Sequence, residues 1–259
     1  MLRSGLFLAF CALPCGGAAA PPERIVSLAP NLTQMVVALG GGGSLAAVTP
    51  FCQAPADVAR LPGGIQPEAE TVLGLGPDLV LATSMTPATT REQLARLGVR
   101  VEVLDADSLD GIRGTQQKLA GLLGVAAPVL PVTAKPVTGK SVALLFGADT
   151  GYSAGCGTHA HEILEAAGLR NIAADAGGPW PQLGEEFLLA ADPDVIVIAD
   201  YGGANRKEVL EILQRHPVRR HLAAVRSGRI VVFPAPAFSV PGPAALEAGE
   251  KLRAEVKKF

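Results

Sequence analysis

Hydrophobic and polar positions repeat in the same order in two parts of the chain. In each part a glutamate is followed seven residues later by Pro-Asp and then by an unbroken apolar run. The two copies occupy residues 70–82 and 186–199, and they begin with Glu70 and Glu186. Equal spacing in two distant segments predicts two similarly built halves.

Each copy has the pattern of a short helix, a proline stop and a strand. Proline cannot continue a helix, and it pushes the preceding residue toward an extended conformation. The runs at 79–82 and 195–199 lack polar alternation, so we expect parallel strands buried on both faces. Glu70 and Glu186 then fall in the first turn of a surface helix. The helix dipole favours negative charge there, so a purely stabilising role is the alternative for both.

The other apolar runs continue this α/β pattern along the chain. Asn31 and Gln34 are predicted to cap a helix that stops at Gly40, and the glycines that follow predict a flexible turn. Strands are expected at 24–28, 45–48, 99–104, 141–146 and 229–233. Helices are expected at 31–40, 91–97, 109–123, 159–167, 208–215 and 244–257.

The first 20 residues have the composition of a secretory signal peptide. A basic start at Arg3 is followed by a short apolar run and three alanines ending at Ala20. This order predicts cleavage after Ala20 and an exported protein. A lipid anchor on Cys15 is an alternative, but the Leu13-Pro14 pair before it disfavours lipidation.

A proline-rich segment near the middle divides the rest of the chain. Prolines at 128, 131 and 136 exclude a continuous helix there. We therefore expect an N-terminal α/β lobe at 21–108, a connecting helix and linker at 109–138, and a C-terminal α/β lobe at 139–259.

Composition narrows the possible partners. The formal net charge is −2, with 22 basic and 24 acidic residues, so nothing indicates nucleic-acid binding. Beyond the signal segment no stretch offers the roughly 20 continuous apolar residues of a membrane span. With 49% hydrophobic residues the chain can build one large core or two modest cores, and the repeat favours two.

Cys52 and Cys156 are the cysteines beyond the signal segment. One lies in each expected lobe, so a disulfide would have to cross between the lobes, and we expect two unpaired thiols instead. His159 follows Cys156 by three residues, which leaves a thiol enzyme as a remote alternative, although no orienting Asp or Asn is identifiable. His159 and His161 cannot form an i, i+4 metal-binding pair, and each is expected at the surface.

Three loops carry side chains suited to binding. Asn31 follows the first predicted strand, at the edge where open α/β sheets bind ligands. Phe51 and Cys52 lie between prolines. Trp180, the single tryptophan, lies among glycines and prolines, where it is better placed to stack on a flat ligand than to fill a core.

Several motifs together resemble the periplasmic substrate-binding proteins of ABC importers for cobalamin, haem and ferric siderophores. These motifs are the segments 24–31, 51–55, 155–171 and 179–182 and the two Glu…Pro-Asp units. The resemblance runs from Arg24 to the last predicted helix. It implies two α/β lobes joined by a backbone helix, a ligand held between the lobes, and a carrier rather than an enzyme.

The resemblance also assigns roles to individual residues. In this family a surface glutamate on each lobe docks to arginines of a twofold permease, which here implies Glu70 and Glu186. The implied partners are an ABC permease dimer and its ATPase, with the binding protein as a monomer in the periplasm. The implied ligand contacts are Phe51, Tyr152 and Trp180, at aromatic positions of the cobalamin binders, with Cys52, Asn31 and Met85 as neighbours. No cofactor or metal site of the protein's own is expected.

The ligand class follows from what the chain lacks relative to the family. The haem binders place an iron-ligating tyrosine before the first docking glutamate, and anionic siderophores need several arginines near the ligand. Neither feature occurs at the corresponding positions. We therefore expect a carrier of cobalamin or a related corrinoid. A haem or ferric-siderophore carrier is the alternative, and a thiol enzyme using Cys156 and His159 is a remote one.

Overall fold

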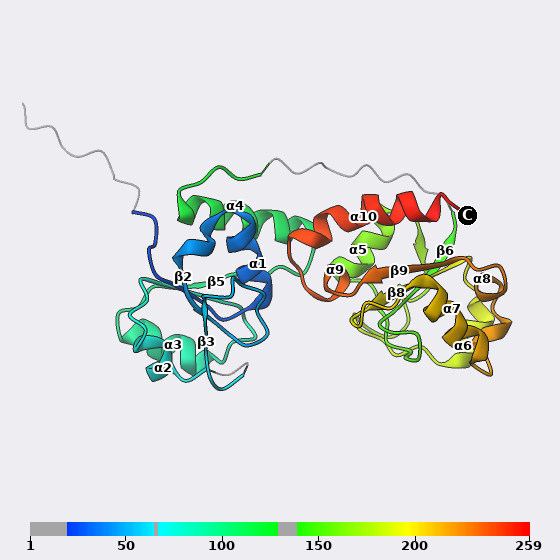
Figure 1. The fold of residues 1–259 in the computed structure, drawn as a ribbon, viewed down its shortest axis with the longest axis horizontal. Helices are drawn as coiled ribbons and strands as arrows, with labels where there is room; N and C mark the ends of the chain where they lie inside the picture. The colour runs from blue at the N-terminus through cyan, green and yellow to red at the C-terminus, as the bar shows by residue number, and fades with distance from the viewer. Residues whose placement is uncertain (1–19, 65–66, 129–138) are drawn as a thin grey trace, which may run out of the picture.

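The computed structural model describes residues 20–64, 67–128 and 139–259, which form two α/β lobes (Figure 1). The N-terminal sheet has the order β3-β2-β1-β4-β5, with β1 (Ile25–Ser27), β2 (Leu45–Val48), β3 (Ala59–Arg60), β4 (Leu79–Ala82) and β5 (Val101–Val103). The C-terminal sheet has the order β7-β6-β8-β9, with β6 (Ser141–Leu145), β7 (Arg170–Asn171), β8 (Val195–Asp200) and β9 (Ile230–Pro234). These strands all pair in parallel, so the predicted two-lobed α/β fold is confirmed.

Helices cover both faces of each sheet. One layer runs along the whole molecule and consists of α1 (Pro30–Ala38), α4 (Leu109–Leu123), α5 (His159–Ala166) and α10 (Pro243–Val256) (Figure 1). The opposite faces carry α2 (Ala69–Leu73) and α3 (Ala88–Arg96) in the N-terminal lobe, and α6 (Glu185–Ala191), α7 (Arg206–Arg215) and α8 (Ala223–Arg226) in the C-terminal lobe. Shorter elements are η1 (Gly41–Ser44), η2 (Arg219–His221) and α9 (Pro236–Ser239).

The order of elements in the N-terminal lobe recurs in the C-terminal lobe. The series β1-α1-β2 corresponds to β6-α5-β7, and α2-β4-α3-β5-α4 corresponds to α6-β8-α7-β9-α10. The two repeated sequence units are therefore α2-β4 and α6-β8. Glu70 and Glu186 are each the second residue of their helix, as the equal spacing predicts.

The aspartate of each Pro-Asp pair has the same structural role in both lobes. The Asp78 carboxylate accepts hydrogen bonds from the backbone nitrogens of Glu23 (2.7 Å) and Arg24 (3.1 Å), at the start of β1. The Asp194 carboxylate accepts from the backbone nitrogen (2.7 Å) and hydroxyl (2.8 Å) of Ser141, at the start of β6. These bonds lower the pKa of Asp194, the backbone bond most. Each aspartate thus joins the start of its own strand to the start of the neighbouring central strand.

Strand side chains alternate between two buried layers. In β4, Leu79 and Leu81 pack against the layer of α1 and α4, whereas Val80 and Ala82 pack on the side of α2 and α3. The strand β8 alternates in the same way between two clusters. All the side chains of these two predicted apolar runs are buried, which confirms the prediction of strands covered on both faces.

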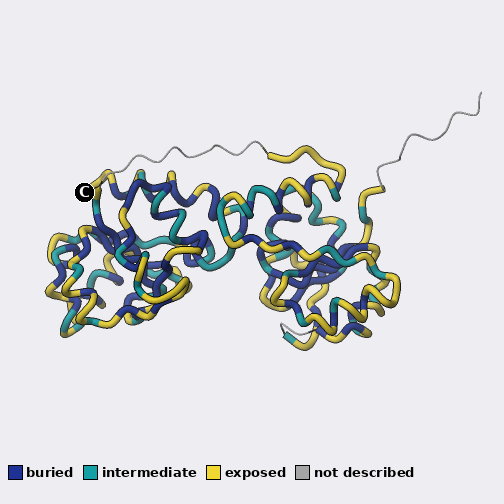
Figure 2. The backbone as a smooth tube through the Cα atoms, turned by 180° about the vertical axis from the view of Figure 1, so that it is seen from behind, coloured by how far each residue is buried: buried dark blue, intermediate teal, exposed yellow. Residues whose placement is uncertain are grey.

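The repeat predicts two separate hydrophobic cores, one in each lobe, and the structure differs from this prediction. The helical layer shares one buried cluster that includes Leu32 of α1, Leu119 of α4 and Leu252 of α10 together with residues of both sheets. Separate clusters fill the two opposite faces. Figure 2 shows buried backbone grouped in each lobe, with further buried stretches along the helical layer. The molecule therefore has two sheets and one continuous layer of helices.

Helix α4 lies over the N-terminal lobe with its first residue at the junction of the lobes, within the predicted connecting segment 109–138 (Figure 1). The backbone nitrogen of Leu109 donates to the carboxylate of Glu162 on α5 (2.6 Å), and the helix ends at Gly124, whose φ of 67° favours glycine. Residues 129–138 of the connector and residues 1–19 of the predicted signal peptide lie outside the described residues. In the part of the chain that the structure describes, no helix combines the length and apolar character of a membrane span.

Two local predictions are wrong. Helix α1 begins at Pro30 with Ala29 at its N-cap, so Asn31 lies inside the helix and does not cap it. Proline suits the first helical position because its missing N–H would have no partner there. Residues 41–44 form the short helix η1 rather than an irregular turn. The strands β3 and β7 have two residues each and carry too little pattern to be predicted.

Candidate ligand-binding site

A cavity of about 350 Å³ lies at the junction of the two lobes. Its N-terminal walls follow the carboxyl ends of β1, β2, β4 and β5, and its C-terminal wall is the segment 239–241, which begins at the last residue of α9. The lining residues are Leu28, Ala29, Pro30, Asn31, Thr49, Phe51, Thr83, Ser84, Met85, Thr86, Asp105, Ala106, Asp107, Ser239, Val240 and Pro241. The position agrees with the rule that parallel α/β sheets bind ligands at the carboxyl ends of their strands.

The cavity combines soft apolar groups with oxygen acceptors. Met85 is 88% exposed and Phe51 is also exposed, so both can contact a ligand directly. Hydroxyl and carboxylate oxygens supply the polar part of the lining, and no lysine or arginine is among the lining residues. The carboxylate of Asp105 accepts a hydrogen bond from the backbone nitrogen of Ser84 (2.8 Å), which joins the loops after β4 and β5.

Three of the six predicted ligand contacts, Asn31, Phe51 and Met85, line this cavity. Cys52 does not, because its thiol is buried in the core and lies 3.1 Å from the hydroxyl of Thr49. Both Cys52 and Cys156 are free thiols, which confirms the expectation of no disulfide between them.

Tyr152 and Trp180 lie on the C-terminal lobe outside the lining of the cavity. Tyr152 pairs with Gln182 in an isolated antiparallel bridge, so the two predicted aromatic segments are neighbours. The Trp180 ring is 50% exposed and packs against Phe146, with ring centroids 5.9 Å apart. Of the three rings that the resemblance assigns to one ligand, Phe51 alone is among the lining residues of this cavity.

His159 connects Trp180 to the wall of the cavity. Its ring meets the Trp180 ring edge-on at 6.4 Å, and it hydrogen bonds to the backbone of Phe238, the residue before the lining residue Ser239. His159 is only 3% exposed, and its Nε2 atom has no hydrogen-bond partner. Burial lowers the pKa of His159 to about 4, so the imidazole is neutral at pH 7. The prediction of a surface histidine is wrong for this residue.

Cys156 contacts a different histidine from the one predicted. Its Sγ atom lies 3.7 Å from Nε2 of His161, whereas His159 faces Trp180. Asn171 provides the orienting amide that the sequence did not reveal, with its Nδ2 3.1 Å from Nδ1 of His161. The pairing of Cys156 with His159 as a thiol enzyme is therefore wrong.

The orientation of the Asn171 amide also decides what His161 can do. The amide oxygen accepts from the backbone of Ala173, and the amide nitrogen donates to the carbonyl of Ala154. Nδ1 of His161 consequently accepts a hydrogen bond, so the ring hydrogen is on Nε2, which lies 3.7 Å from the sulfur and 3.7 Å from the carboxylate of Glu165. In this tautomer Nε2 offers the sulfur a donor rather than an acceptor.

Glu70 and Glu186, the two glutamates to which the resemblance assigns docking, lie on the opposite side of the molecule from the helical layer. Both are exposed, and their helices α2 and α6 lie on the same side of the molecule, opposite α4 and α10 (Figure 1). Among the described residues, no group of three histidine, cysteine, aspartate or glutamate side chains could hold a metal ion. A larger depression of about 520 Å³ follows β9 and the end of α10, but only the C-terminal lobe lines it, so we place the ligand site at the junction.

Comparison with known proteins identifies the family. A family model described as a periplasmic binding protein matches residues 131–237. The vitamin B12-binding protein of Pectobacterium atrosepticum is 30% identical over 222 residues, which cover 75% of this chain and 77% of that protein. The chain belongs to the periplasmic binding protein family. The predicted family and fold class are therefore confirmed.

Solved structures of periplasmic binding proteins share the two-lobed fold. The periplasmic vitamin B12-binding protein BtuF of Vibrio cholerae matches with a TM-score of 0.70 at 24% identity, covering 92% of this chain and 98% of that one. A periplasmic heme-binding protein from Pseudomonas aeruginosa matches with a TM-score of 0.69 at 27% identity, covering 92% of both chains. These relatives are binding proteins rather than enzymes, and membership of the family indicates an exported protein that serves an importer.

Proposed function

We propose that this binding protein captures cobalamin or a related corrinoid at the lobe junction and delivers it to an ABC permease. The observation that carries the proposal is the composition of the cavity, which has exposed Phe51 and Met85, many oxygen acceptors and no basic side chain in its lining. The corrin ring is a broad apolar surface edged by amide groups, and these amides can donate to hydroxyl and carboxylate oxygens.

The same composition disfavours the alternative ligands. Haem carries two carboxylates, and many ferric siderophore complexes are anionic. Asp105 and Asp107 would repel such ligands, and the cavity lining offers no arginine or lysine to compensate. The named vitamin B12-binding relatives support the corrinoid, and the heme-binding structures keep haem as the alternative to be tested.

Delivery requires contact with both halves of a transporter. Glu70 and Glu186 occupy equivalent positions on equivalent helices, so they can offer two matched charges to a twofold permease dimer with its ATPase. Each exposed ion pair contributes about 0.2–1 kcal/mol, which suits reversible docking. The protein would act as a monomer in the periplasm after removal of residues 1–20.

Fluorescence of Trp180 tests the ligand class directly. Titration of the purified protein with cyanocobalamin or cobinamide should quench the fluorescence of this single tryptophan, and the quenching should saturate at one ligand per protein. The dissociation constant for haemin should be at least about 10-fold higher because of its charge. Haemin dimethyl ester, which lacks the two charges, should recover part of that difference. Quenching by haemin that is tighter than quenching by cyanocobalamin would contradict the corrinoid.

A pair of variants separates charge from shape in the same assay. Asp107→Asn removes a carboxylate from the cavity lining and should improve haemin binding relative to cyanocobalamin. Asp110→Asn changes an exposed aspartate that pairs with Arg113 outside the lining, and it should leave both affinities unchanged. Equal effects of the two variants would show that the cavity does not select by charge.

A further inference from the structure

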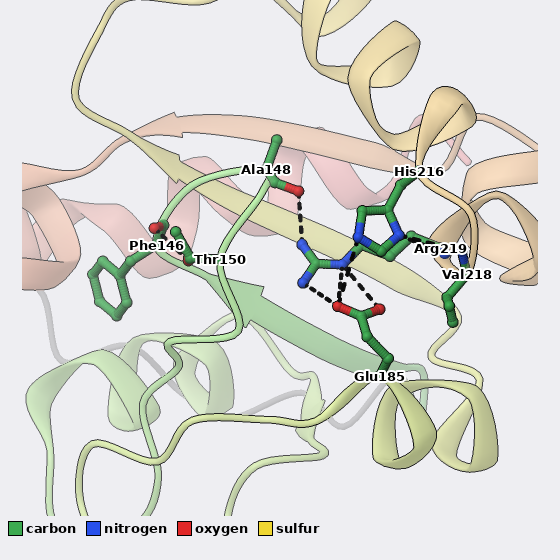
Figure 3. A network of polar contacts seen from close by, with 7 residues as sticks. All are labelled: Phe146, Ala148, Thr150, Glu185, His216, Val218 and Arg219. Carbon is green, nitrogen blue, oxygen red and sulfur yellow. Dashed lines mark hydrogen bonds and ion pairs between the residues drawn. The ribbon is translucent and has the colours of Figure 1, made fainter.

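Arg219 is a buried cation in the C-terminal lobe, 2% exposed, at the start of the short helix η2. Its guanidinium holds the Glu185 carboxylate through Nη2 (2.6 Å) and Nε (3.1 and 3.3 Å), and its Nη1 donates to the carbonyl of Ala148 (2.7 Å) (Figure 3). Charge-assisted, forked contacts of this kind are among the strongest hydrogen bonds in proteins. One side chain therefore connects three segments that are distant in sequence.

His216 fixes the backbone from which Arg219 projects. Its Nδ1 accepts hydrogen bonds from the backbone nitrogens of Val218 (3.3 Å) and Arg219 (3.2 Å) (Figure 3). Its Nε2 lies 3.9 Å from Oε1 of Glu185, the same carboxylate oxygen that Nη2 of Arg219 contacts. The backbone of Arg219 and its guanidinium are thus both held by hydrogen bonds, so the fold sets the direction in which the side chain points.

One end of this network is the loop that carries Tyr152. The loop follows β6. The backbone nitrogen of Phe146 donates to the carbonyl of Tyr152 (2.9 Å), and the carbonyl of Phe146 accepts from the hydroxyl of Thr150 (2.7 Å). The Phe146 ring packs against Trp180. Ala148, whose carbonyl binds Arg219, lies within this loop between Phe146 and Tyr152.

The other end of the network is the docking helix. Glu185 is the first residue of α6, and the docking glutamate Glu186 is the next residue. The equivalent first residue of α2 in the N-terminal lobe is Ala69, which is buried and has no charge to offer. Ala69 therefore cannot form an ion pair like that of Glu185, and α2 is not held through its first side chain in this way.

We propose that Arg219 is a positioning residue for docking, which fixes α6 and its Glu186 relative to the loop that carries Tyr152. The inference rests on the proposed function, because it assigns Glu186 to the permease contact. By holding α6 in place before docking, the network removes an ordering step from the encounter. It also makes the docking charge of this lobe depend on the conformation of the Tyr152 loop.

Three variants test the contact, with a matched pair as control. Glu185→Gln keeps the shape of the carboxylate but removes its charge, Arg219→Met removes the cation, and Arg219→Lys keeps a charge but not the planar fork. Arg215→Met and Glu211→Gln disrupt an exposed ion pair on the neighbouring helix α7 and serve as controls. All variants are compared at a temperature where circular dichroism shows each to be folded.

The docking measurement uses the permease and ATPase reconstituted in liposomes, with cyanocobalamin as the ligand. Arg219→Met and Glu185→Gln should raise the protein concentration that half-saturates ATPase stimulation by about 10-fold, since a mobile helix must be ordered on docking. The affinity for cyanocobalamin should stay within about twofold of the unchanged protein, and Arg219→Lys should recover part of the docking loss. A purely structural role would change the half-saturating concentration and the ligand affinity together, or would change neither. Either result would overturn the proposal.

Hydrogen exchange of the isolated protein tests the connection without a transporter. In Arg219→Met the backbone amides of α6 and of the Tyr152 loop should exchange faster together, while those of α2 stay unchanged. Faster exchange in only one of the two segments would overturn the proposed connection. If the unaltered protein neither binds cyanocobalamin nor stimulates the transporter, the proposed function fails and the docking role falls with it, whereas the exchange result still shows whether the network connects the segments.

Discussion

Single side chains at the lobe junction show how burial changes their chemistry. His159 is neutral at pH 7 because burial lowers its pKa to about 4, although a hydrogen bond to the backbone of Phe238 and the charge of Asp107 act in the opposite direction. The neutral ring packs against Trp180, the residue expected to report ligand binding. Protonation of this histidine is therefore less favourable in the folded protein than in the unfolded chain.

This difference predicts a pH dependence of stability. The folded-state pKa of about 4 lies below the ordinary histidine value of 6.5, so the unfolded chain binds more protons between these two pH values. The free energy of unfolding should fall by up to about 3 kcal/mol as the pH drops from 6.5 to 4, at about 1.4 kcal/mol per pKa unit. Urea unfolding across this range measures the slope. His159→Asn should flatten it, whereas His221→Asn, which changes an exposed ring, should not. An unchanged slope in His159→Asn would assign the pH dependence to other groups.

At the scale of helices and strands, α10 and α5 pack closely against each other within the shared helical layer. Gly249 lies where a Cβ atom would be 2.9 Å from the Cβ of Ala166, which is closer than Cβ atoms approach in real proteins. A residue without a Cβ is therefore needed at this contact. The helix α10 also packs against helices of the other lobe, so it cannot move away from α5 without disturbing those contacts.

Two glycine-to-alanine changes separate packing from helix propensity. Gly121→Ala in α4 adds a Cβ with no atom within 4 Å and should stabilise the protein by about 0.5–1 kcal/mol. Gly249→Ala gains the same propensity but forces α10 away from α5, so it should destabilise the protein by about 1–3 kcal/mol. Thermal unfolding of the two variants measures the contrast. Equal stabilisation by both changes would show that the two helices can separate without loss.

At the scale of the whole molecule, the repeated halves present equivalent helices on one side and a shared layer on the other. Glu70 and Glu186 occupy equivalent positions on α2 and α6, and the cavity lies between the lobes. This arrangement separates the surface proposed for docking from the surface proposed for binding. Changes at one can therefore be measured without directly altering the other.

Charge reversal at the two glutamates proposed for docking should separate uptake from ligand binding. Glu70→Lys combined with Glu186→Lys should reduce cyanocobalamin transport in proteoliposomes to background, because two attractive contacts become repulsive. The affinity for cyanocobalamin should stay within about twofold. Glu250→Lys, on the opposite helical layer, provides the matched control and should transport normally. A loss of ligand affinity in the double variant would instead make these glutamates structural.

The sequence by itself determined the repeated α/β architecture and most of its elements. The apolar runs, the Pro-Asp stops and the helix at Leu109–Leu123 were predictable because local pattern and backbone preference decide them. Asn31 could be assigned to the site because loops after parallel strands meet at one edge of a sheet, whereas Phe51 and Met85 were assigned from the family resemblance.

Only the tertiary structure decided which distant side chains meet. It paired Cys156 with His161 rather than His159, buried His159 beside Trp180, and merged part of the two expected cores beneath a common layer of helices. It also brought together Arg219 and Glu185, which no spacing pattern connects. Such contacts depend on how the helices pack and the loops close in three dimensions, and sequence periodicity describes each element only along its own length.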